Sequence, residues 1–145
     1  MKSSKGSIVG KQKPNALVDA LVSIRGHIKF KRTIKFSLSV LIDLVTKQET
    51  SNAIYANECI QEKGYRDLFK ATKTHSMDDV IVKDATHLLQ QISLYSEDEV
   101  LPDKFVELGA TETLHLAITT QPWKDVETLL YILDVLEYLL GSTGV

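Results

Sequence analysis

The sequence is poor in several features, and each shortage excludes a class of protein. Cys59 is the single cysteine among 145 residues, so the chain cannot form an internal disulfide, which fits a reducing compartment. No apolar run approaches the ~20 residues that a membrane-spanning helix needs. The first ten residues lack the apolar core of a secretory signal. We therefore expect a soluble, cytoplasmic protein.

Charge is unevenly distributed along the chain. Residues 1–35 carry nine Lys or Arg side chains and one acid, a net charge of +8, whereas residues 36–145 carry eight basic and eighteen acidic side chains, a net charge of −10. This asymmetry predicts either an anion-binding N-terminal region or attraction between the two parts of the chain. Five basic residues interspersed with Phe30 and Phe36 form what we call the basic cluster: Arg25, Lys29, Lys31, Arg32 and Lys35.

The first fourteen residues differ from the rest of the chain. Residues 1–14 are polar and contain Ser, Gly and Lys, which predicts a flexible basic tail before a single domain over residues 15–145. Asn15 is a suitable N-cap for a first helix. The apolar residues of this first helix recur at spacings of three and four up to Ile24, and Gly26 is expected to end the helix.

The next segments are also predicted to be helical. Residues 28–36 alternate between apolar and polar side chains, as in a strand, but no convincing second strand exists to pair with them. We therefore predict a helix over residues 33–47. Another helix follows the Ser51 cap, buries Cys59 on its apolar side and stops at Gly64.

Two further helices precede the C-terminal segment. A short helical face covers residues 65–72, and Ser76 is expected to cap the helix after it. Residues 81–95 then carry a regular apolar stripe, and Pro102 suits the first turn of the following helix.

Residues 104–141 contain the clearest helical unit. A short apolar helix runs into Gly109, a second helix extends to about Thr119, and a long apolar helix ends near Leu140. Between the last two helices, Trp123 follows a proline and is expected to pack at the hinge.

Overlaying these segments indicates an internal repeat. Residues 62–64 align with residues 107–109 at a shift of 45, and residues 85–95 align with residues 129–139 at a shift of 44. A fainter copy places Leu41 on Leu89, a shift of 48. Periods of about 40–47 residues with two or three helices are typical of HEAT and armadillo repeats. Such units stack because no single one can bury its apolar face.

Over residues 33–140 the chain resembles the armadillo family. Gly64 and Gly109 match the glycine between the first two helices of that family's repeat. The long third helices carry leucine-rich cores at Leu41–Leu44, Leu89–Ile92 and Leu133–Leu136. The resemblance implies an all-α fold, namely a short right-handed α-solenoid of about three armadillo-like repeats.

The resemblance also implies a binding surface. In the armadillo family the third helices line a concave groove where asparagines hold an extended peptide, flanked by tryptophans one turn earlier. None of the matching positions here is Asn or Trp, although Gln91 keeps an amide that can donate and accept. The implied groove residues are Ser39, Asp43, His87, Gln91, Tyr131 and Val135.

Residue constellations for catalysis or cofactor binding are weak. Gly6–Lys11 is one residue short of a phosphate-binding loop, and Gln12 stands where Ser or Thr would hold magnesium. Glu112–His115 and Asp84–His87 have the spacing of metal-binding pairs, but they lie on different kinds of helix and are expected to be surface polar residues. Cys59 lies on an apolar helix face, as a structural thiol does. We expect no enzymatic activity, cofactor or metal.

These observations favour a non-enzymatic module that binds another protein or peptide as an adaptor or scaffold. One alternative is a homo-oligomer, in which a basic front and an acidic rear associate through exposed repeat ends. Another is that the basic cluster binds nucleic acid, an anionic membrane or an acidic peptide. A purely structural interpretation is that the basic cluster is a solvated helix face that pairs with the acidic part of the chain.

Overall fold

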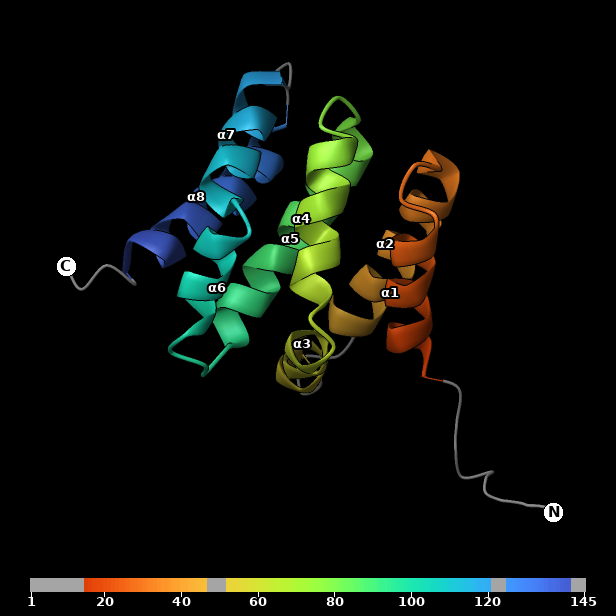
Figure 1. Ribbon diagram of the computed structural model, residues 1–145, viewed down its shortest axis with the longest axis horizontal. Helices are drawn as coiled ribbons and strands as arrows, with labels where there is room; N and C mark the ends of the chain where they lie inside the picture. Colours follow the sequence, from red (N-terminus) through yellow and green to blue (C-terminus); the bar gives the residue numbers. More distant parts are fainter. Residues whose placement is uncertain (1–14, 47–51, 121–124, 142–145) are drawn as a thin grey trace, which may run out of the picture.

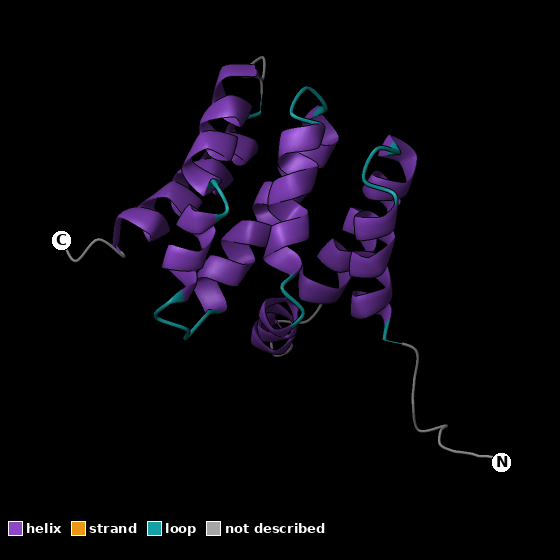
Figure 2. Ribbon diagram, viewed as in Figure 1, coloured by secondary structure: helices purple, strands orange, loops and turns teal. Residues whose placement is uncertain are grey.

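The computed structural model describes residues 15–46, 52–120 and 125–141. Within these ranges the chain forms eight helices and no strand (Figures 1 and 2). In chain order the helices are α1 (Ala16–Gly26), α2 (Lys31–Thr46), α3 (Asn52–Gln61), α4 (Gly64–Thr74), α5 (Asp79–Tyr95), α6 (Leu101–Glu107), α7 (Ala110–Thr120) and α8 (Val126–Gly141). The predictions made for the N-terminal tail, Ser51 and Trp123 lie outside the described residues.

The helices form three groups that lie side by side (Figure 1). The first group is α1 and α2, the second is α3, α4 and α5, and the third is α6, α7 and α8. Helix α5 contacts α2 on one side and α8 on the other, while α4 contacts α1 and α7. The short helix α3 packs against α2, α4 and α5. Corresponding helices of successive groups therefore pack against one another.

Several local sequence signals act as predicted, and one differs. Asn15 caps α1 by accepting a hydrogen bond from the backbone N–H of Val18 at 3.1 Å. Pro102 lies in the first turn of α6. Backbone N–H groups in a first turn have no partner within the helix, so the missing N–H of proline costs no hydrogen bond there. The predicted Ser76 cap of α5 is wrong, because Asp78 accepts from the N–H groups of the next turn instead. Both residue types can cap a helix, and they stand two residues apart.

The two glycines that suggested a repeat have different structural roles. Gly109 has a φ of +81°, in the left-handed region that favours glycine, and it separates α6 from α7. Gly64 does not end α3 as predicted, because it opens α4 after Lys63, which itself has a φ of 57°. A Cβ on Gly64 would lie 2.9 Å from both Cδ atoms of the buried Leu21. Gly64 thus permits the close approach of α4 to α1.

The buried residues of α2, α5 and α8 fix how these helices correspond. In each helix four buried residues repeat at the same spacings, and successive sets are related by a shift of 47 residues. The sets are Ile34, Leu38, Leu41 and Val45; Ile81, Ala85, Leu88 and Ile92; and Thr128, Ile132, Val135 and Leu139. The shifts of 48 and 44 inferred from leucine positions are therefore wrong for these helices.

The corrected shift changes the assignment of Val135. This residue is fully buried and corresponds to the core residue Leu88, so the prediction that its side chain contacts a partner is wrong. Leu133, which the sequence paired with the buried Leu89, is instead 47% exposed. Leucines occur on more than one flank of α8, so the leucine pattern alone does not show which flank faces the core.

Candidate functional site

The line of contact between α5 and α8 brings complementary side chains together on the surface. The rings of His87 and Tyr131 stack nearly parallel, with centroids 4.4 Å apart and an interplanar angle of 2°. One turn along, the side-chain amide of Gln90 donates to Asp134 at 2.6 Å. We call this row the α5–α8 seam; its residues are Lys83, His87 and Gln90 on α5 and Glu127, Tyr131 and Asp134 on α8.

The seam arises directly from helical periodicity. Residues 83, 87 and 90 are separated by four and three positions, and residues 127, 131 and 134 have the same spacing. Side chains with these spacings share one flank of a helix. Because each facing pair is separated by 44 residues, α5 and α8 run parallel and in register along the whole row. Every seam residue keeps part of its side chain exposed to solvent.

One end of the seam is occupied by ion pairs. The ammonium of Lys83 lies 2.9 Å from Glu127 and 3.1 Å from Asp125, and all three side chains are substantially exposed. Hydrogen bonds from Lys83 to these two carboxylates raise the pKa of the lysine above its ordinary value. One ammonium thus faces two carboxylates at this end of the seam. Exposed pairs of this kind add little to stability.

The other end of the seam opens into a shallow depression of about 360 Å³. Gln90 and Asp134 form its boundary with the seam, and Leu94 contributes an apolar side chain that is 66% exposed. Its other lining residues are Glu137, Tyr138 and Ser93, whose hydroxyl donates to the carbonyl of Leu89. The depression can therefore accept an apolar side chain beside hydrogen-bonding groups.

Burial keeps the two stacked rings uncharged at neutral pH. Desolvation lowers the pKa of His87, an effect that nearby Glu127 opposes and Lys83 reinforces. Desolvation also raises the pKa of Tyr131, and the carboxylate of Glu127 adds to this shift. A neutral imidazole has one donor and one acceptor nitrogen, and a protonated phenol can both donate and accept. These groups match the donors and acceptors of a peptide backbone.

The structure places the residues predicted for the groove in three different settings. His87 and Tyr131 are in direct contact, and Gln91 lies beside them, donating from Nε2 to the side-chain oxygen of Gln90 at 3.3 Å. Ser39 and Asp43 are exposed on α2, outside the seam. Val135, as described above, belongs to the core.

Sequence reasoning missed most of the polar residues of the seam. Lys83, Gln90, Glu127 and Asp134 were not among the predicted site residues. Their signal is that a basic or amide side chain on one helix is followed by a carboxylate 44 residues later on the next. A search for complementary pairs at a constant separation, rather than for repeated leucines, would have found them.

The basic cluster divides into paired and exposed residues. Arg25 makes a bidentate contact with Asp67, from Nε to Oδ1 at 3.1 Å and from Nη2 to Oδ2 at 2.7 Å. Lys35 lies 3.3 Å from Asp78. The predicted pairing with the acidic part of the chain therefore holds for these two residues. Lys29, Lys31 and Arg32 are exposed, and Arg25 and Lys35 also keep 52% and 44% of their side chains exposed.

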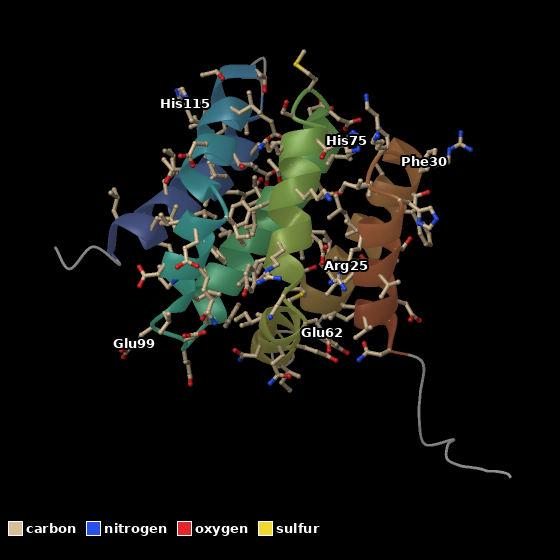
Figure 3. The ribbon with its side chains drawn as sticks, in the orientation of Figure 1. Arg25, Phe30, Glu62, His75, Glu99 and His115 are labelled. Carbon is tan, nitrogen blue, oxygen red and sulfur yellow. The ribbon has the colours of Figure 1, made fainter. Side chains whose placement is uncertain are left out.

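Arg25 also joins the first helix group to the turn before α4. Its Nη2 donates to the backbone carbonyl of Glu62 at 3.4 Å, and Figure 3 shows Arg25 directed toward this part of the molecule. Arg25 therefore takes part in an internal contact, although its side chain is still 52% exposed.

Other chemically interesting residues are separated from the seam. Cys59 is buried, and burial raises the pKa of its thiol to about 12, which suppresses the thiolate. Among the residues that the structure describes, no three His, Cys, Asp or Glu side chains are placed to share a metal ion. Glu112 and His115 are exposed on α7, and His115 is labelled in Figure 3. Gly6–Lys11 lies outside the described residues.

Comparison with known proteins adds no further assignment. No family model, no curated protein and no solved structure gives a match to this chain. Within the described ranges, no helix combines the length and the apolar character required to cross a lipid bilayer.

Proposed function

We propose that the chain is a short solenoid of armadillo-like repeats whose α5–α8 seam binds an extended peptide segment of another protein. The solenoid is supported by the constant shift of 47 residues between buried sets and by the contacts of α2 with α5 and of α5 with α8. The binding site is supported above all by one observation. His87 and Tyr131, two of the residues that the resemblance implies for the groove, stack on each other where α5 meets α8.

The chemistry of the seam fits an extended backbone. An extended peptide presents N–H and C=O groups that need partners, and the amide of Gln91 and the neutral imidazole of His87 can each donate and accept. The outer faces of the stacked rings supply flat apolar area. Leu94 and Tyr138 line the depression at one end, where an apolar peptide side chain would be received.

The proposed role is binding without chemistry. Lys83 and Glu127 form an ion pair, Asp134 accepts from the amide of Gln90, and the two rings are uncharged at neutral pH. The seam thus resembles a recognition surface more than a site that activates a nucleophile. The protein would act as an adaptor or scaffold that holds a segment of its partner.

Selection from a library of random peptides displayed on phage tests this proposal. We expect the purified protein to enrich related sequences, and binding of a selected peptide to fall at least tenfold when Gln91→Ala and Tyr131→Ala are combined. The matched control combines Phe30→Ala and His115→Ala, two exposed sites at opposite ends of the molecule (Figure 3), and should leave affinity unchanged. The helical circular dichroism of both variants should equal that of the wild type. Equal losses in the two variants, or no enrichment, would contradict the proposal.

A further inference from the structure

A small depression lies where the start of α4 meets α6, and it shares no residue with the α5–α8 seam. Its volume is about 200 Å³, below the roughly 300–1,000 Å³ of sites that hold a drug-sized ligand. We call it the α4–α6 pocket; its lining residues are Lys63, Tyr65, Arg66, Lys104, Glu107 and Leu108. A ligand that fills this pocket must therefore be a small chemical group.

Positive charge dominates the lining of the α4–α6 pocket. Lys63, Arg66 and Lys104 bring three cations against the single carboxylate of Glu107, a net charge of +2. Lys104 also lies 3.7 Å from Asp98, a long contact between two partly exposed side chains. Among the described residues, no carboxylate stands at ion-pair distance from Lys63 or from Arg66. Two cations of the pocket are thus available to an anion from solution.

A buried hydroxyl group in the same lining also lacks a partner. Tyr65 is only 3% exposed, and its ring lies against that of Phe105 with centroids 5.4 Å apart. The hydroxyl forms no hydrogen bond with any residue of the described ranges. Buried polar groups in native proteins are nearly always hydrogen-bonded, so an unpaired one indicates a ligand or a water molecule. Because Tyr65 lines the pocket, a ligand held there would supply the missing partner.

The first turn of α4 favours the same sign of ligand charge. Lys63, the N-cap residue, forms no side-chain hydrogen bond with this turn, so the turn has no side-chain cap. The free N–H groups and the dipole of a helix both favour an anion at its N-terminus. Lys63 and Arg66 belong to this turn and its cap, so backbone and side chains agree in favouring an anion.

We propose that the α4–α6 pocket binds a phosphate group. A phosphate dianion matches a lining of net charge +2 better than a singly charged carboxylate does. The guanidinium of Arg66 can donate two parallel hydrogen bonds to phosphate oxygens, and the hydroxyl of Tyr65 can donate another. This inference is independent of the peptide-binding proposal, because none of the residues that carry it belongs to the seam.

The phosphate group has two possible sources, namely free phosphate and a small phosphate monoester. A larger depression of about 530 Å³ shares Glu107 and Leu108 with the pocket. Val106 and Leu116 contribute apolar side chains to this larger depression. The organic part of a monoester has room there, whereas free phosphate would leave it empty.

Amide chemical-shift titration at constant ionic strength tests the proposal and separates the two sources. Inorganic phosphate and phenyl phosphate are the probes, each added to isotopically labelled protein. We expect saturable shifts at Gly64, Tyr65 and Arg66, with a dissociation constant on the order of 1 mM for inorganic phosphate. Tighter binding of phenyl phosphate assigns a monoester as the source, and equal affinity assigns free phosphate. Acetate that binds as tightly as phosphate would contradict the assignment of a dianion.

A matched pair of charge variants tests which cations bind the phosphate. Lys63→Gln combined with Arg66→Gln should weaken phosphate binding about tenfold or more. Lys29→Gln combined with Arg32→Gln removes the same charge from exposed residues of the basic cluster and should leave affinity within about twofold. All four residues are exposed, so helical circular dichroism should remain unchanged. Equal losses in the two variants, or shifts that rise without saturation, would overturn the phosphate site.

Tyr65→Phe separates phosphate binding from packing. This substitution removes the hydroxyl and keeps the ring that contacts Phe105. Because the hydroxyl has no partner among the described residues, urea unfolding without phosphate should show a variant at least as stable as the wild type. Its phosphate affinity should nevertheless fall about threefold or more. Unchanged phosphate affinity would overturn the proposal, because the unpaired hydroxyl is the observation that calls for a ligand.

Discussion

The two junctions between helix groups use similar residues in different ways. Between the first and second groups, Arg25 forms a salt bridge with Asp67, whose side chain is only 8% exposed. At the same junction, His75 Nε2 donates a hydrogen bond to the carbonyl oxygen of Ile28 at 2.6 Å. Between the second and third groups, Lys83 meets carboxylates that are 43% and 66% exposed. At the first junction the carboxylate of the ion pair is buried although Arg25 is 52% exposed, whereas at the second junction both partners of the ion pairs are exposed.

This difference suggests that one junction stabilises the fold and that the other offers polar atoms to a ligand. A buried carboxylate is costly to leave unpaired, so the contact of Arg25 with Asp67 fixes how the first two groups pack. Exposed pairs contribute little to folding, and their polar atoms remain open to a ligand. We therefore assign a mainly structural role to the first junction and place the candidate binding site at the second.

The largest effect is expected from substitutions on α8 that test the register of the second junction. Val135→Asp buries an unpaired charge in the core and should destabilise the protein by about 4 kcal/mol or more, measured by urea unfolding. Leu133→Asp, two residues earlier on an exposed flank, should lower stability by about 1 kcal/mol or less. Similar losses for the two variants would show that the shift of 47 residues is wrong.

The first junction can be broken by removing its arginine. Arg25→Ala leaves the buried carboxylate of Asp67 without its charged donor, so we expect a loss of about 2–3 kcal/mol in the free energy of unfolding. Lys29→Ala removes an exposed member of the same basic cluster and should change stability by less than about 0.5 kcal/mol. If the two losses are alike, the ion pair between Arg25 and the buried carboxylate of Asp67 does not hold this junction.

A smaller effect is expected at the N-cap of α5. Asp78→Ala removes the capping carboxylate and the contact with Lys35, which should lower stability by about 1 kcal/mol at neutral pH. Burial alone raises the pKa of Asp78, but the hydrogen bonds from Ile81 and Lys35 outweigh it and hold the pKa below its ordinary value. The folded-state pKa thus lies below the unfolded value of about 3.9, so this stabilisation is present above that pH.

The pH dependence of that difference provides the check. As pH falls through the folded-state pKa, Asp78 becomes protonated in both states and its stabilisation is lost. Thermal unfolding of the wild type and of Asp78→Ala should therefore converge in strong acid. A difference in stability that stays constant from neutral pH into strong acid would refute the role of the ionised cap.

The smallest effect is expected at the exposed ion pairs of the seam. Lys83→Ala should change stability by no more than about 0.5 kcal/mol, because its pairs with Glu127 and Asp125 lie at the surface. Chemical denaturation in low and high salt should show the difference disappearing as salt is added. A loss as large as that of Arg25→Ala would remove the contrast between the two junctions.

Much of the fold could be predicted from apolar spacing and helix-start residues, because these features depend only on residues near one another in the sequence. The spacing of Leu88, Leu89 and Ile92 predicted the buried face of α5, and Asn15 and Pro102 marked helix starts that the structure confirms. The role of Gly64 could not be predicted in this way. It depends on the approach of Leu21, which is distant in the sequence.

The candidate site was only partly predictable for a related reason. His87, Gln91 and Tyr131 were found through the resemblance to armadillo repeats, and the structure brings the two rings into contact. Val135 was misassigned because α8 has apolar residues both on its core flank and on its outer flank. The facing partners Gln90 and Asp134 are revealed by the packing of α5 on α8, which no single helix specifies.

The central claim is that the α5–α8 seam binds an extended peptide, and amide chemical-shift mapping tests it most directly. A peptide selected by the wild-type protein would be titrated into isotopically labelled protein while its backbone resonances are followed. The account predicts that the largest shifts cluster around His87, Gln91 and Tyr131, and that His87→Ala combined with Tyr131→Ala abolishes them. Shifts centred on the basic cluster, with the seam unaffected, would contradict it.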